Sequence, residues 1–165
     1  MHTNTELYLR NIIFGISDSL VSTVGLLSGI DASGTTRQVV LLTGIIYAFV
    51  EAFSMAVGSF LSEESAEQYE TKSAATDSKP FVAGTIMFVS FVLASFIPIV
   101  PYMLWSISTA LWLSITFSII ALFIVGIISA KFAKINLWQQ GLKTALLGGA
   151  AIVIGVLVGK FVKTS

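Results

Sequence analysis

Cysteine is absent from this chain of 165 residues, and charged residues are few. Without a thiol, the sequence excludes disulfide bonds, thiolate metal sites and iron–sulfur clusters. Charged residues make up 11% of the chain, whereas a typical soluble domain carries about 25%. The nine basic and nine acidic residues balance, so no excess of positive charge points to nucleic acid. Together with a mean hydropathy of +0.90, this composition indicates an integral membrane protein.

Catalytic motifs are also missing. The sequence contains no HExxH motif, and its single histidine, His2, stands at the N-terminus without a serine or cysteine partner that would form a catalytic pair. An intramembrane enzyme is therefore the least favoured class. We expect no enzymatic activity and no permanently bound cofactor.

Five apolar segments are long enough to cross a bilayer, since about 20 helical residues span its hydrocarbon core. We expect spans at residues 11–30, 38–61, 80–100, 104–130 and 142–162. Pro98 and Pro101 are expected to interrupt the third helix and turn the chain. The predicted fold class is an all-α integral membrane protein, with residues 1–165 as a single transmembrane domain. Residues 62–79 form its only sizeable polar piece, a short acidic loop that we expect to be cytoplasmic.

The basic residues predict the orientation of the spans. One side of the predicted bundle has six: Arg10, Lys72, Lys79, Lys131, Lys134 and Lys143. The other side has only three: Arg37, Lys160 and Lys163. Because cytoplasmic loops carry an excess of Lys and Arg, we expect the N-terminus in the cytoplasm and the C-terminus on the far side.

The first span contains a carboxylate, Asp18, and no basic residue inside the span to pair with it. Helical spacing places Asp18 in a row of small and polar residues, with larger apolar residues on the opposite side. The row consists of Asn11, Gly15, Asp18, Ser22, Gly25 and Gly29. An ionisable residue inside a membrane marks a functional site by default, so we expect this face to line a path.

The second span has two rows with a four-residue spacing. The first is a small-residue ribbon of Gly44, Ala48, Ala52 and Ala56, which lets another backbone approach closely, either within the protomer or across a dimer axis. Beside it run Glu51, Met55 and Ser59. This second row therefore places another membrane carboxylate one helical turn from a thioether.

Two carboxylates on consecutive spans favour a cation path, because each costs about 2.5–3.5 kcal/mol to insert. Oxygen ligands alone suit Mg²⁺, Ca²⁺ or Mn²⁺, and a nearby thioether favours a softer transition metal. The alternative is a non-transporting membrane scaffold or regulatory protein that dimerises through its small-residue helix faces. In that case Glu51 hydrogen-bonds a neighbour and Met55 fills a gap in the packing.

Four segments follow one another along nearly the whole chain: FGISDSLVSTVGLLSG, FSMAVGSFLSEESAEQYE, FIPIVPYML and GLKTALLGGAAIVIGVLVGKF. In this order they resemble the vacuolar iron transporter family, including its nodulin-21-like members. The resemblance implies a five-span homodimer that exports Fe²⁺, Mn²⁺ or a similar ion from the cytosol in exchange for protons. The implied path lies between the two subunits and is lined by the first and second helices.

The resemblance also implies roles for individual residues. Asp18 matches the first-helix transport carboxylate, and Met55 matches the second-helix thioether. Glu67 and Glu70 match the start of a long, Glu-rich cytosolic domain that collects metal in well-known members and is nearly absent here. Glu51 stands where many relatives have a small residue, so its place in the path rests on its position alone. Ser22 and Ser59 complete the expected path.

The resemblance further implies the membrane in which the protein works. We expect a cell membrane if the source is prokaryotic, and a vacuolar or other organelle membrane if it is eukaryotic. The expected partners are the lipid bilayer, a second copy of the chain, divalent metal ions and protons.

Overall fold

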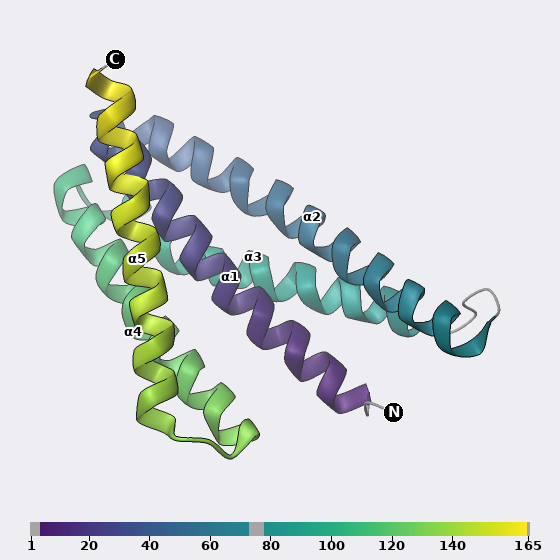
Figure 1. The fold of residues 1–165 in the computed structure, drawn as a ribbon. Helices are drawn as coiled ribbons and strands as arrows, with labels where there is room; N and C mark the ends of the chain where they lie inside the picture. The colour runs from purple at the N-terminus through teal and green to yellow at the C-terminus, as the bar shows by residue number, and fades with distance from the viewer. Residues whose placement is uncertain (1–3, 73–77, 165) are drawn as a thin grey trace.

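The computed structural model describes residues 4–72 and 78–164, which form five long helices joined by short connections (Figure 1). The helices are α1 (Asn4–Ala32), α2 (Arg37–Thr71), α3 (Lys79–Leu104), α4 (Ile107–Ala133) and α5 (Leu137–Thr164). Each is long and apolar enough to cross a membrane. The expectation of an all-helical protein with five candidate spans is confirmed.

Helix α1 is the centre of the bundle, since it packs against all four of the other helices. Helix α2 packs mainly against α3, and α5 packs against α1 and α4. The two ends of the chain lie at opposite ends of the bundle (Figure 1). From the turn that joins them, α1 and α2 spread apart toward the N-terminal end of α1.

The α1–α2 turn closes one end of the bundle. Leu27, Val40, Ile99 and Tyr102, from α1, α2 and α3, belong to one buried apolar cluster there. The Tyr102 hydroxyl also donates a hydrogen bond to the Asp31 carboxylate at 3.0 Å. The two helices are therefore held together at this end and free to diverge at the other.

Helix α2 continues beyond its predicted end at residue 61 as far as Thr71. Its last turn is capped by Lys72, whose left-handed backbone (φ 56°) lets its N–H donate to the Gln68 carbonyl at 3.0 Å. The first ten residues of the expected loop 62–79 are thus helical, and Lys79 already belongs to α3. Positions 73–77 of that loop lie outside the described residues.

The prediction that Pro98 and Pro101 end the third helix is wrong, because α3 runs through both to Leu104. Pro98 and Pro101 cannot donate to the carbonyls of Ala94 and Ile97, but other hydrogen bonds from neighbouring helices hold α3 beyond them. Here the Ser114 hydroxyl donates to the Pro98 carbonyl at 2.8 Å. The Arg37 guanidinium donates to the carbonyls of Met103 and Trp105, at 3.4 and 3.2 Å. These donors from α4 and α2 support the end of α3.

Helices α1 and α5 cross closely through glycines. A Cβ at Gly29 would lie 2.7 Å from the Gly155 carbonyl oxygen, and a Cβ at Gly155 or Gly159 would collide with the carbonyl of Gly25 or Gly29. Small residues four apart on both helices allow this approach. Gly25 and Gly29, which were expected to line a polar path, therefore pack against α5.

The small-residue ribbon of α2 packs inside the protomer. Gly44, Ala48 and Ala52 are buried, and a Cβ at Gly44 would lie 2.8 Å from Leu27 of α1 and 3.5 Å from Ile99 of α3. Farther along, a Cβ at Gly84 of α3 would lie 2.8 Å from the carbonyl oxygen of Ala56. The ribbon is the surface through which α2 contacts α3 and the core side of α1.

Candidate functional site

Facing residues of α1 and α2 follow a regular antiparallel register. The Ser59 hydroxyl contacts the Asn11 side-chain oxygen at 3.3 Å. About two turns farther in, the Glu51 carboxylate is close enough to Asp18 for their charges to repel. Next, the Tyr47 hydroxyl lies beside Ser22. In each pair the residue numbers add up to 69 or 70, so residue n of α1 faces residue 70 − n of α2.

A half-open groove of about 550 Å³ runs between the diverging halves of α1 and α2, with α3 contributing to its wall. Its lining comes from three helices: Arg10, Asn11 and Phe14 of α1; Ser54, Met55, Gly58, Ser59, Ser62 and Glu63 of α2; and Met87 of α3. Hydroxyl, amide, carboxylate and thioether groups therefore face one space. Asp18 and Glu51 are not part of this lining and lie one helical turn farther in, beyond Phe14 and Met55.

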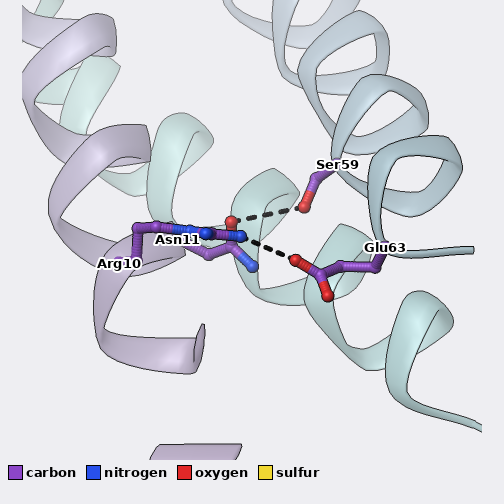
Figure 2. Close-up of polar contacts among 4 residues, drawn as sticks. All are labelled: Arg10, Asn11, Ser59 and Glu63. Carbon is purple, nitrogen blue, oxygen red and sulfur yellow. Dashed lines mark hydrogen bonds and ion pairs between the residues drawn. The ribbon is translucent and has the colours of Figure 1, made fainter. Parts of the chain in front are cut away.

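An ion pair stands at the mouth of the groove (Figure 2). The Arg10 guanidinium lies 2.6 Å from a Glu63 carboxylate oxygen, with the arginine side chain 62% exposed and the glutamate side chain 19% exposed. Behind it, the Asn11 amide is buried, and its nitrogen has no hydrogen-bond partner among the described residues. Figure 2 shows the Asn11 oxygen directed at Ser59 and the ion pair beside it.

The two membrane carboxylates, Asp18 and Glu51, are each half-buried beyond the inner end of the groove. Ser22, one turn after Asp18, donates its hydroxyl to the Asp18 backbone carbonyl at 2.6 Å. Like charges this close are unfavourable in a poorly solvated place, and a cation between them would relieve the repulsion. The structure thus brings together Asp18, Ser22 and Glu51 from the expected path.

The remaining expected residues are distributed along α2. Met55 and Ser59 line the groove. Glu67 is half-buried and Glu70 exposed on the polar extension of the helix. Sixteen residues separate Glu51 from Glu67, or about 24 Å of helix, so Glu67 and Glu70 cannot share an ion with Asp18. Within the described ranges, no three His, Cys, Asp or Glu side chains gather as a metal cluster.

The lining or neighbouring residues that were not predicted include Arg10, Tyr47, Glu63 and Met87. Tyr47 and Glu63 could have been found, because they extend the row of Glu51, Met55 and Ser59 by one turn in each direction at the same four-residue spacing. Arg10 and Met87 carry no such signal. Arg10 joins the site through a partner 53 positions away, and Met87 through the packing of α3.

Comparison with known proteins gives consistent matches along the chain. A sequence model described as the VIT family matches residues 9–78 and 67–160. Vacuolar iron transporter 1 of Arabidopsis thaliana is 21% identical, over 94% of this chain and 86% of its own length. An uncharacterized protein of Methanocaldococcus jannaschii is 26% identical, over 92% of this chain and 87% of its own. Vacuolar iron transporter homolog 4 of Arabidopsis thaliana is 42% identical over 55 residues, which are 33% of this chain and 28% of that protein.

Proposed function

The chain belongs to the VIT family of integral membrane transporters, which are not enzymes, and from that membership we propose that it exports a divalent transition-metal ion, Fe²⁺ or Mn²⁺, from the cytosol. The two relatives named vacuolar iron transporters support iron as a substrate. The groove supports a divalent ion more generally, because it combines oxygen donors with thioethers.

The observation that carries the proposal is the α1–α2 register. It lines up Glu63, Ser59, Met55 and Glu51 on α2 opposite Asn11 and Asp18 on α1. Along α2 these groups span 12 residues, or about 18 Å, which is more than half of a hydrocarbon core of about 30 Å. A cation that leaves Glu63 can therefore find a new ligand at each helical turn until it reaches the carboxylate pair.

The direction of transport follows from the shape of the groove and the predicted orientation. The groove opens toward the N-terminal end of α1, which we place in the cytoplasm, and the apolar cluster around Tyr102 closes the other end. With the predicted orientation, we interpret this arrangement as an inward-open state that loads from the cytosol. Release on the far side requires α1 and α2 to separate at the closed end.

We place the ion path at the interface of a homodimer. Asp18 and Glu51 are partly exposed on a single protomer, and in a bilayer the exposed part of each would face hydrocarbon at a cost of several kcal/mol. A second copy packed over the groove would cover both carboxylates and, by two-fold symmetry, add its own pair. The apolar residues on the exposed side of α2, which include Val50, Phe53 and Val57, suit such a contact.

Proton exchange completes the proposal. A carboxyl group must be ionised to bind a metal ion, so loading releases protons and unloading takes them up again. Asp18 and Glu51 are the groups that would exchange them, and Tyr47 and Ser22 lie beside them at the inner end of the row.

The test is metal uptake by proteoliposomes that contain the purified protein, with Fe²⁺, Mn²⁺, Co²⁺ and Ca²⁺ offered separately and a pH-sensitive dye enclosed. We expect faster uptake of Fe²⁺ or Mn²⁺ than of Ca²⁺, together with proton movement in the opposite direction. Uptake equal to that of protein-free liposomes would favour the scaffold alternative. The ribbon on which that alternative rests, however, packs within one protomer.

A further inference from the structure

Met87 of α3 lines the same groove as Met55 of α2. We propose that their two thioethers form a soft-metal site within each protomer, and that Met87 is a selectivity-determining residue for the proposed transport. The class of ligand is a thiophilic or borderline transition-metal ion, for which Cd²⁺ is a suitable probe. The inference adds a second sulfur to the path and rests on the proposed function only where it concerns transport.

Met55 and Met87 lie at the same level along the groove. The α1–α2 register places Met55 opposite Gly15, since 55 and 15 add up to 70. The Met87 sulfur lies at that same Gly15, 3.1 Å from the position that a Cβ on this glycine would take. Met55 and Met87 therefore approach the groove at one height, from two different helices.

The proposed site also needs space between the two methionines. Gly15 has no side chain, so α1 contributes only backbone at this level, and Met87 occupies the place next to it. Phe14 and Ser54 are exposed beside the groove and leave it half-open. Met87 is 3% exposed and Met55 is half-buried. A thioether chain has three rotatable bonds, and the proposal requires both side chains to turn their sulfurs from this packing toward the ion.

Oxygen donors lie on both sides of the two methionines along the path. The oxygen donors Glu63, Ser59 and Asn11 lie on the outer side of the two methionines, and the carboxylates of Asp18 and Glu51 lie on the inner side. Oxygen donors bind Ca²⁺, Mg²⁺ and Mn²⁺ as well as softer metals, whereas thioethers bind only the softer ones appreciably. A pair of sulfurs between two groups of oxygens would therefore favour soft ions in transit.

The absence of cysteine makes the site easy to test, because any sulfur bound to a metal must belong to methionine. The chain has four methionines. Met55 and Met87 line the groove. Met103, also on α3, is 49% exposed at the opposite end of that helix, and Met1 lies outside the described residues. Met103→Leu is thus a matched control for Met87→Leu.

The binding experiment uses the detergent-purified protein and Cd²⁺ alone, with the metal's ligands identified by X-ray absorption spectroscopy. We expect sulfur scattering in the wild type, less of it in Met87→Leu or Met55→Leu, and none in the double variant. Met103→Leu should match the wild type. Leucine nearly preserves the volume of methionine, so these variants should fold. A wild-type spectrum with oxygen ligands only, or sulfur scattering unchanged in Met87→Leu, would overturn the proposal.

The transport experiment measures how Cd²⁺ inhibits Mn²⁺ uptake into proteoliposomes. In Met87→Leu the inhibitory concentration of Cd²⁺ should rise roughly tenfold, as loss of about 1.4 kcal/mol of binding would produce, while the KM for Mn²⁺ rises far less, because the oxygen donors hold Mn²⁺. An equal rise in both values would mean that Met87 only shapes the groove, and the selectivity role would be lost. If the wild type moved no metal, the proposed function would fail, and the binding experiment would still decide the thioether site.

Discussion

Asp18 is the residue on which the proposed transport depends most. It is half-buried in the middle of α1, its carboxylate faces Glu51, and it matches the family's first-helix carboxylate. Asp18→Asn retains the shape and hydrogen bonding of the side chain but removes the charge that a cation must meet. We expect metal flux into proteoliposomes to fall to background, while the amount of folded protein is unchanged.

Substitutions of two further acidic residues give metal fluxes with which that of Asp18→Asn can be compared. Glu51→Gln should reduce the flux less than Asp18→Asn, because Asp18 would still offer one carboxylate from each subunit. Glu67→Gln should change the flux modestly at most, since Glu67 lies about 24 Å of helix from Glu51. Normal flux in Asp18→Asn at matched protein levels would show that the path avoids the polar face of α1.

The role of a single residue can be predicted from the sequence where the helical period alone places side chains on the same face of one helix. Asp18 could be singled out because a carboxylate in an apolar span is costly wherever the helix packs. Glu51, Met55 and Ser59 shared a face by their four-residue spacing. Met87 could not be found in this way, because its place in the groove depends on how α3 packs against α1 and α2.

The five helices were predictable as spans, and their ends were not. Hydropathy depends on composition over about 20 residues, so it locates the middle of each span. The ends depend on single interactions: Lys72 caps α2, and Arg37 and Ser114 support α3 beyond its prolines. The sequence also does not distinguish a glycine that lines a path from one that contacts another helix. Only the packing of α5 against Gly25 and Gly29 shows that these two are contact residues.

The α1–α5 crossing leads to a prediction at the scale of helices. A Cβ at Gly155 would collide with the Gly25 carbonyl of α1, whereas a Cβ at Gly149, on the same helix, would have no neighbour within 4 Å. Gly155→Ala should therefore lower the free energy of unfolding by about 1–3 kcal/mol, as overpacking does. Gly149→Ala should be neutral or stabilise α5 by up to about 1 kcal/mol through helix propensity.

Thermal unfolding of both glycine variants in detergent measures the difference. A lower melting temperature for Gly155→Ala than for Gly149→Ala is the expected result. Equal melting temperatures would mean that α1 and α5 can separate without cost. The contact between the centre of the bundle and its last helix would then be looser than the structure indicates.

For the whole molecule, the odd number of spans fixes where the chain ends should lie. The two termini lie at opposite ends of the bundle, and the excess of Lys and Arg on the N-terminal side predicts that this side is cytoplasmic. Reporter proteins fused to each terminus should therefore report opposite compartments, with the N-terminal fusion in the cytoplasm. Two termini in one compartment would contradict the five-span arrangement, and a reversed pair would contradict the predicted orientation alone.

The proposed dimer can be tested with single cysteines, because the chain has none of its own. If a second copy covers the groove, Ser54, which is exposed at its edge on α2, should approach its counterpart across the two-fold axis. Trp112 is 70% exposed on α4, a helix that packs against α1, α3 and α5. A short thiol cross-linker applied to membranes in metal-free buffer should convert most of Ser54→Cys, and little of Trp112→Cys, to a species of twice the protomer mass.

Cross-linking of Trp112→Cys alone would place the dimer on the other face of the bundle. Asp18 and Glu51 would then be left at the lipid surface, and the path would need another cover.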